Sequence, residues 1–229
     1  MLHASKPSVF FNANGEATER TVLAVTAGCL IAILVCIAYV DRPIAEYAHA
    51  VTKLNEPFYK ALTKLVDPVP PLAATTAAGF GIAAFFGVRP GPLGQTALRI
   101  AIAILIAVAI KEQIKVFAGR SWPETWTNNN LSYIKDGVYG FEFMRGLGGR
   151  GCALFHSFPS GHMTVMSAAA VGLALNFPIL KWLAPIPVAL VAIGMIGADY
   201  HWVSDLIAGT LLGSASALAV HRLGRNPGP

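Results

Sequence analysis

Charge is scarce in this chain. Only 13% of its 229 residues are Asp, Glu, Lys or Arg, whereas 55% are hydrophobic, and an average soluble protein carries about 25% charged residues. The deficit falls in long uncharged runs, which is the pattern of a polytopic membrane protein. The net charge of +5 comes without any basic cluster interleaved with aromatic residues, so we expect no nucleic-acid partner. Basic loops that face cytoplasm and anionic lipid account for it more simply.

Cysteine is scarce as well, with three residues in the whole chain. Cys29 and Cys36 lie inside an apolar run, where we expect them to pack, and Cys152 lies in a polar loop with no evident partner. Three cysteines in these places provide neither a disulfide framework nor a metal site. The sequence also contains no carboxylate cluster suited to a divalent cation. We therefore predict no cofactor and no metal.

Apolar segments of helical length follow one another along the chain. A helix of about 20 residues spans the roughly 30 Å hydrocarbon core of a bilayer. We therefore predict an all-α membrane protein whose six transmembrane helices form a single domain over residues 21–220, after a polar segment, 1–20, and before a tail, 221–229. The expected helices cover residues 21–40, 69–88, 96–118, 160–177, 183–198 and 202–220.

Two connections between these helices are unusual. Residues 41–67 mix charges with apolar side chains spaced three and four apart, which predicts one or two amphipathic helices at the membrane interface. Residues 119–158 form a long polar loop rich in glycine and aromatic residues. A loop of this length in a compact bundle is usually functional, and its aromatic content fits a lid at the headgroup level.

The distribution of charge predicts an orientation. Six spans place both chain ends on one side, which carries seven Lys or Arg and two Glu, whereas the other side carries ten basic and ten acidic residues. Short basic loops mark the cytoplasmic side. We interpret the chain as a bacterial inner-membrane protein with cytoplasmic termini, and its periplasmic face then holds three groups of polar residues at helix ends.

The first group is Lys115 and Arg120, at the end of the third expected helix. The ammonium group of a lysine and the planar guanidinium of an arginine can bind an anion together. When such a pair stands alone, it is more often two side chains that extend their charges to the membrane surface.

The second group is Pro159-Ser160-Gly161-His162, at the start of the fourth helix. Ser160 is a suitable N-cap, which places the backbone N–H groups of Gly161 and His162 at the positive end of the helix dipole. Glycine there allows a ligand to approach the backbone closely. Taken singly, such a serine is usually only a cap and such a histidine a packed residue.

The third group is His201 and Asp205, which share one face of the sixth helix. A carboxylate that accepts from Nδ1–H fixes the imidazole tautomer and leaves Nε2 with a free lone pair, as a nucleophile or base requires. Each of the three groups is common by itself. Their convergence at one membrane face predicts a reactive site.

These residues make the chain resemble the type-2 phosphatidic acid phosphatase superfamily of membrane enzymes. That family has three motifs, Lys-x6-Arg-Pro, Pro-Ser-Gly-His and Ser-Arg-x5-His-x3-Asp. The resemblance extends over about residues 20–220 in order, spacing and sidedness. The matching residues are Lys115, Pro123, Pro159-Ser160-Gly161-His162, His201 and Asp205.

The chain departs from the motifs at two arginines. Trp122 stands at the arginine of the first motif, and Gly194-Met195 stands at the Ser-Arg of the third. We expect Arg120 to be the substitute, with Arg145 or Arg150 as alternatives. Losing two charge-assisted contacts without replacement would cost several kcal/mol, so we expect altered substrate preference or reduced activity.

The resemblance implies a mechanism. His201 attacks phosphorus to form a phosphohistidine, Asp205 orients it, and His162 protonates the leaving oxygen and then activates water. No metal is required. The implied substrate is a lipid phosphate or diphosphate whose headgroup lies at the interface while its tail stays in the bilayer. The oxygens of the transferring phosphoryl group would be held by Lys115, Arg120, Ser160 and the Gly161 N–H.

Three other functions remain open. A lipid phosphotransferase would use the same phosphohistidine with a different acceptor. A catalytically weak protein that binds lipid phosphate fits the two missing arginines. A transporter is less favoured, because the ionisable residues gather at one plane of helix ends and not at the bilayer midplane. The lipid and the oligomeric state are left undetermined by the sequence.

Overall fold

The computed structural model describes residues 18–124, 130–144 and 155–225. Their regular structure is helical, with only isolated β-bridges besides. The longer helices are α1 (Glu19–Val35), α4 (Val69–Phe85), α5 (Pro92–Ala118), α7 (Gly161–Asn176), α8 (Pro185–Gly197) and α9 (Val203–Arg225). The shorter helical elements are η1 (Cys36–Val40), α2 (Asp41–Thr52), η2 (Lys53–Asn55), α3 (Glu56–Thr63), η3 (Lys64–Val66), α6 (Tyr133–Asp136) and η6 (Pro178–Trp182).

The all-α prediction is confirmed, and several helices have the composition of membrane spans. Four helical stretches are long and apolar enough to cross a bilayer: Glu19–Phe85, Pro92–Ala118, Pro178–Gly197 and Val203–Gly224. The first is 67 residues long, because α1 to α4 follow one another through short helical turns. The predicted amphipathic segment is helical within this stretch. The predicted start of the tail falls inside α9.

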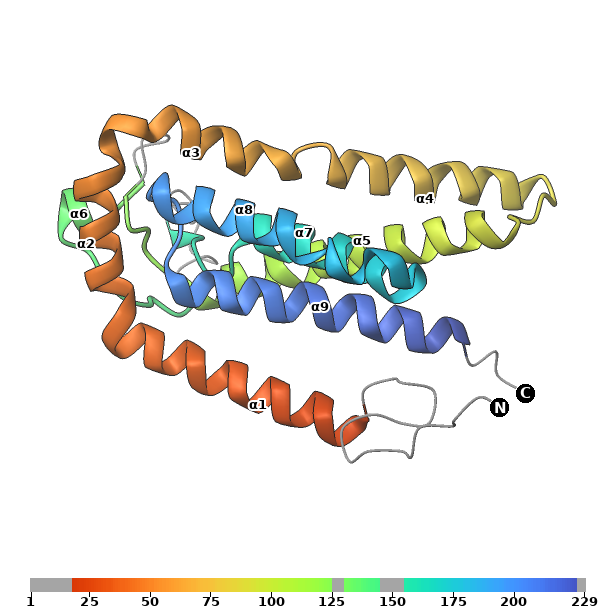
Figure 1. Ribbon diagram of the computed structural model, residues 1–229, viewed down its shortest axis with the longest axis horizontal. Helices are drawn as coiled ribbons and strands as arrows, with labels where there is room; N and C mark the ends of the chain where they lie inside the picture. The colour runs from red at the N-terminus through yellow and green to blue at the C-terminus, as the bar shows by residue number, and fades with distance from the viewer. Residues whose placement is uncertain (1–17, 125–129, 145–154, 226–229) are drawn as a thin grey trace.

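Figure 1 shows that the long helices lie side by side along the longest axis of the molecule. α2 crosses one end of them, and the start of α1 and the end of α9 lie at the opposite end. The most extensive contact is between α7 and α9, and α5 packs against both. The predicted polar groups lie at the ends of these three helices, which meet beneath α2. Arg120 follows the end of α5, and His201, expected within the last helix, precedes the start of α9 at Val203.

Two glycines of α9 set the distance between α9 and α7. A Cβ atom at Gly209 would lie 2.5 Å from the carbonyl oxygen of Ser160, and one at Gly213 would collide with the carbonyl oxygen of Thr164. Small residues at this spacing let two helix backbones approach closely. The backbone N–H of Ser160 donates to the carbonyl oxygen of Asp205 at 3.1 Å. The start of α7 is thereby fixed beside the start of α9.

A second close contact joins α3 to α8. A Cβ atom at Gly194 would lie 2.9 Å from Cβ of Leu62 and from the carbonyl oxygen of Tyr59, and one at Gly197 would collide with the ring of Tyr59. The hydroxyl of Thr52 donates to the carbonyl oxygen of Gly197 at 2.7 Å. The segment between α1 and α4 therefore covers α8 directly.

Candidate active site

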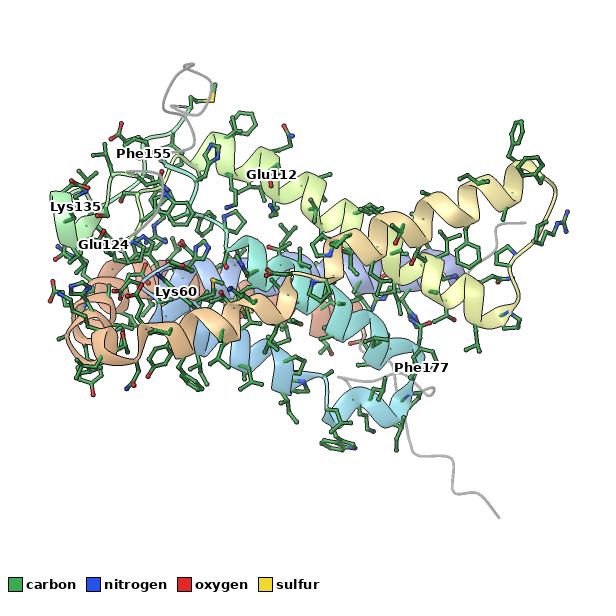
Figure 2. The ribbon with its side chains drawn as sticks, turned by 90° about the horizontal axis from the view of Figure 1, so that it is seen from above. Lys60, Glu112, Glu124, Lys135, Phe155 and Phe177 are labelled. Atoms are coloured by element: carbon green, nitrogen blue, oxygen red, sulfur yellow. The ribbon has the colours of Figure 1, made fainter. Side chains whose placement is uncertain are left out.

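The predicted groups meet at the end of the molecule where α2 lies. Figure 2 labels Glu124 and Phe155 at this end and Phe177, the residue after α7, toward the other. The chain that links α5 to α7 is held here by backbone bonds. Ser121 N donates to Gly140 O at 3.2 Å, and Ser157 N donates to Arg120 O at 3.2 Å. The described parts of this link therefore lie across the helix ends.

The histidine–aspartate pair of the third group is formed. Asp205 Oδ2 lies 3.2 Å from His201 Nδ1 and accepts from the backbone N–H of Trp202 at 3.3 Å. The side chain of His201 is 4% exposed and that of Asp205 is fully buried. Burial lowers the pKa of His201 below its ordinary value, against the opposing effect of Asp205. The imidazole is therefore neutral near pH 7, with Nε2 available as a lone-pair donor.

Arg120 lies behind this pair. One terminal nitrogen, Nη1, donates to Asp205 Oδ1 at 2.5 Å and to Ser204 Oγ at 2.6 Å, and Nη2 donates to Asp41 Oδ2 at 2.6 Å. The side chain is fully buried, and its guanidinium carbon lies 4.7 Å from the ring centroid of Phe141. Both terminal nitrogens are thus engaged by protein acceptors. This geometry does not favour the predicted contact with phosphate, and it favours a role in fixing Asp205.

Asp41 is a site residue that sequence reasoning missed. It is 1% exposed, and its Oδ1 accepts from the backbone N–H of Ser204 at 3.0 Å while Oδ2 accepts from Ser204 Oγ at 2.6 Å. Asp41 therefore caps the first turn of α9 from a segment far away in sequence. A signal was present, because Asp41 is the first charge after a long uncharged run, and a carboxylate at such a place usually has a specific partner.

The second group has the predicted helix start. Ser160 is the N-cap of α7, with an extended backbone, and its hydroxyl accepts from Met163 N at 3.5 Å. Gly161 and His162 are the first two residues of the helix, so their N–H groups have no acceptor within it. His162 is half-buried at the second position of this helix. The bond from Ser160 N to Asp205 O at 3.1 Å brings the helix start, and His162 with it, next to the His201–Asp205 pair.

Lys115 joins this arrangement from the last turn of α5. It is nearly buried, its Nζ donates to the carbonyl oxygen of His156 at 2.6 Å, and Nζ lies 5.6 Å from the ring centroid of Trp122. The same ring lies 5.2 Å from the ring of His201. Burial, reinforced by the charge of Lys115, lowers the pKa of His156. The ring of Trp122 thus lies close to both Lys115 and His201.

Lys111 is a second residue that sequence reasoning left out of the site. Its Nζ lies 3.4 Å from the position that a Cβ atom at Gly161 would occupy. The side chain is 13% exposed and pairs with Glu112. The signal was its spacing, because residues four apart on a helix share a face, and Lys111 precedes Lys115 by four. The alternatives proposed for phosphate binding, Arg145 and Arg150, lie outside the described residues.

In the part of the chain that the structure describes, no group of three or more His, Cys, Asp or Glu side chains is arranged to hold a metal ion. The arrangement around His201 includes a buried histidine–carboxylate pair, a helix N-terminus, a second histidine and lysine ammonium groups. Such groups are suited to transfer of an anionic group through a covalent histidine intermediate.

Comparison with known proteins gives relatives of one kind. An undecaprenyl-diphosphatase from Sulfolobus acidocaldarius is 43% identical over 60 residues, which are 26% of this chain and 29% of that protein. The match therefore spans less than a third of this relative's length. The fold resembles the crystal structure of a transmembrane PAP2-type phosphatidylglycerolphosphate phosphatase from Bacillus subtilis, with a TM-score of 0.51, 20% identity, and coverage of 88% of this chain and 96% of that one.

A family model described as the PAP2 superfamily matches residues 96–228. That range is more than half of the chain, and it contains nearly all of α5 together with α7, α8 and α9. It also contains Lys115, the Ser160–His162 helix start and the His201–Asp205 pair. The resemblance drawn from the three motifs is thereby confirmed, and the chain belongs to the PAP2 superfamily.

Proposed function

We propose that this protein is an integral membrane phosphatase that hydrolyses a lipid phosphate or diphosphate through a phosphohistidine. The observation that carries this proposal is the neutral, buried His201, oriented by Asp205 at 3.2 Å, beside the capped N-terminus of α7. A nucleophilic imidazole next to a helix end suited to anions is the arrangement that phosphoryl transfer to histidine requires.

The reaction proceeds in two steps. His201 Nε2 attacks phosphorus in line, so that an N–P bond forms as the bond to the leaving oxygen breaks, and His162 gives a proton to that oxygen. His162 then takes a proton from water, which attacks phosphorus and releases phosphate and free His201. Asp205 keeps the proton on Nδ1 and stabilises the positive charge that develops on the imidazole. Arg120 and Asp41 act as positioning residues for Asp205.

The oxygens of the transferring group are held by backbone and cationic groups. Ser160 and the N–H of Gly161 contribute the helix end, and Lys115 contributes a charge from α5. Lys111 lies across Gly161 and adds a second ammonium at the same place. Arg145 or Arg150 would supplement these groups from the loop between α6 and α7.

The substrate is a lipid because the site lies at the ends of apolar helices. The relatives are named for undecaprenyl diphosphate and for phosphatidylglycerolphosphate, two lipids whose terminal phosphate is joined through oxygen to a membrane anchor. We propose six spans, with cytoplasmic termini and a periplasmic site in a bacterial inner membrane. The position of the start of α1 and the end of α9 opposite the site supports this sidedness (Figure 1).

The test is phosphate release from a panel of lipid monophosphates and diphosphates in detergent, with and without a chelator. The wild-type protein is expected to release phosphate in both conditions. His201→Ala is expected to abolish release, and His162→Ala to lower it by at least about a hundredfold, as removal of a general acid does. His221→Ala, at the other end of α9, is the matched control and should keep full activity.

The covalent step is tested with substrate labelled with radioactive phosphorus. Rapid acid-free quenching of the wild-type protein should trap a labelled, acid-labile and base-stable adduct, and His201→Ala should trap none. Full phosphate release by His201→Ala would exclude the mechanism. Label transferred to an added lipid alcohol in preference to water would identify the protein as a phosphotransferase.

A further inference from the structure

Two tryptophans at the site, the buried Trp202 and the half-buried Trp122, differ in one respect. The indole Nε1–H of Trp202 donates to the carbonyl oxygen of Ser121 at 2.8 Å. The indole Nε1–H of Trp122 is equally enclosed, but it has no hydrogen-bond acceptor among the residues that the structure describes. Buried donors in folded proteins nearly always have an acceptor, and one without a partner destabilises the fold. A residue that retains such a donor needs a physical reason for it.

The position of Trp122 is fixed by its backbone and not by its indole. Tyr133 N donates to Trp122 O at 2.9 Å, Trp122 N donates to Leu131 O at 3.5 Å, and Ile134 N donates to Pro123 O at 2.9 Å. The segment is therefore attached to the start of α6 on one side. These bonds fix the backbone that carries the indole.

The ring of Trp122 lies close to both His201 and Lys115. Its centroid is 5.2 Å from the ring of His201, with the two planes inclined by 46°, and Lys115 Nζ lies 5.6 Å from it. Any phosphate that contacts both His201 and Lys115 is therefore also beside this indole. The side chain of His201 is itself almost completely enclosed. A substrate that reaches His201 must therefore enter the same enclosed space that holds Trp122 Nε1.

Several other donors near the site are already engaged by protein acceptors. The terminal nitrogens of Arg120 are engaged by Asp41, Ser204 and Asp205, and Lys111 pairs with Glu112. The three equatorial oxygens of a transferring phosphoryl group need preorganised donors. A neutral indole N–H can serve as one, because a donor to a charged oxygen contributes more than a donor to a neutral one.

We propose that Trp122 is a substrate-binding residue whose Nε1–H donates a hydrogen bond to a phosphate oxygen held between His201 and Lys115. This assignment rests on the proposed phosphatase function. It explains the indole donor that lacks an acceptor, because the acceptor arrives with the substrate. It also means that part of the phosphate recognition in this chain uses a neutral group.

The test uses orthovanadate, which adopts the five-coordinate geometry of phosphoryl transfer. Binding to the full-length protein in detergent is measured by calorimetry for the wild type, for Trp122→Phe and for Trp182→Phe, an exposed tryptophan at the other end of the molecule. Trp122→Phe keeps an aromatic ring and removes only the donor. We expect it to bind vanadate about tenfold more weakly, equivalent to about 1.4 kcal/mol, and Trp182→Phe to bind as the wild type does.

A purely structural role gives a different result. Because Trp122→Phe removes a donor that has no acceptor, the midpoint of thermal unfolding should stay unchanged or rise. If the vanadate affinity of this variant equals that of the wild type, the proposal is overturned. Should that variant fail to fold, nitrogen-labelled wild-type protein decides. Its NMR spectrum contains four indole N–H resonances, one for each tryptophan, which Phe variants of the other tryptophans assign. The indole N–H proton resonance of Trp122 should shift downfield when vanadate is added. An unmoved resonance also overturns the proposal.

The experiment separates this inference from the proposed function. A wild-type protein that binds vanadate but releases phosphate from no lipid excludes the hydrolase, while the comparison with Trp122→Phe still decides whether the indole binds the anion. A wild-type protein that binds no vanadate excludes the Trp122 contact. An active wild-type protein with an equally active Trp122→Phe variant excludes the contact alone.

Discussion

Nη1 of Arg120 lies 2.5 Å from Oδ1 of Asp205, and both side chains are fully buried. The other terminal nitrogen of Arg120 binds Asp41 at 2.6 Å, so one guanidinium neutralises part of the charge of two enclosed carboxylates. A planar fork of donors can bridge two acceptors in a way that a lysine ammonium cannot. The carboxylate that orients His201 is thus part of an ion network that extends from the start of α2 to the start of α9.

Removal of Arg120 should destabilise the protein. Arg120→Ala leaves two buried carboxylates without a counter-charge, which typically costs about 3–5 kcal/mol. Arg120→Lys should retain only part of that stability, because its point charge cannot bind both carboxylates with good geometry. The measurement is thermal unfolding in detergent, with Lys53→Ala, an exposed residue, as the control. An Arg120→Ala protein as stable as the control would contradict the assignment of the network.

Asp41→Asn should change the pH dependence of activity. The amide keeps an oxygen for the N–H of Ser204 but removes a negative charge from the network that contains Asp205, and it leaves Arg120 to pair with Asp205 alone. Both changes disfavour the imidazolium, so the pKa of His201, already lowered by burial, should fall further. The acidic limb of kcat/KM should therefore move to lower pH relative to wild type, with a lower maximal rate. Titration of the substrate affects both proteins equally, so the difference between their pH profiles reports on the enzyme. An acidic limb that moves to higher pH in Asp41→Asn would contradict this account.

Three glycine-to-alanine substitutions should give three different outcomes. At Gly161 the new Cβ meets the flexible side chain of Lys111 at 3.3 Å, so we expect little loss of stability and a large loss of activity, because the approach to the helix end is blocked. At Gly213 it meets the backbone of Thr164, so the α7–α9 contact should fail and the protein should unfold. At Gly81 there is open space, and alanine should stabilise α4 by roughly 0.5–1 kcal/mol.

These outcomes are checked by thermal unfolding and phosphate release in parallel. Gly81→Ala serves as the matched control for both properties. Normal activity in Gly161→Ala would mean that substrate does not approach the start of α7, and the helix-end assignment would have to be abandoned. Normal stability in Gly213→Ala would show that the two helices are separated further than the backbone contact implies.

Asp199→Asn should be neutral or stabilising, whereas Asp199→Ala should destabilise. Asp199 has a φ of 59°, which Asn tolerates and Ala does not, at a cost of about 1–2 kcal/mol. Burial raises the pKa of Asp199 above its ordinary value, against the opposing hydrogen bond from His49. A raised carboxyl pKa means that stability falls as pH rises from the unfolded pKa through the folded one.

The pH dependence of unfolding tests this assignment. The wild type should lose stability relative to Asp199→Asn as pH rises above 3.8, the ordinary pKa, and the difference should level off above the folded pKa. At lower pH the wild-type carboxyl is protonated in both states, and the two proteins should converge. A wild type that gains stability relative to Asp199→Asn over this range would mean that the ion pair with His49 outweighs burial.

Much of the fold was predictable from local patterns. The uncharged runs gave helices whose observed ends lie within a few residues of the predicted ones, and the Ser160 cap was read from a serine that precedes the helical run. The family was predictable because His201 and Asp205 keep a spacing of one helical turn, and Pro159-Ser160-Gly161-His162 is contiguous. Each of these signals is carried by neighbours in sequence.

The rest depends on contacts between distant segments. Asp41 binds Ser204 across 163 positions, and no period or motif links the two. Arg120 was expected to replace the missing arginine because it lies only two residues from Trp122. The intervening geometry is set by Gly119, which ends α5 with a φ of 56°, and by the bonds of the following loop. These turn Arg120 inward to the carboxylates and leave the ring of Trp122 beside His201.

The contact of α3 with α8 accounts for the residues at positions 194 and 195, where the family motif has Ser-Arg. Met195 is completely buried, and a serine Cβ at position 194 would lie 2.9 Å from Leu62 and from the backbone of Tyr59. A serine at position 194 would therefore clash with α3, and an arginine at position 195 would place a charge in the core. In this chain the close packing of α3 on α8 and the Ser-Arg of the motif exclude each other.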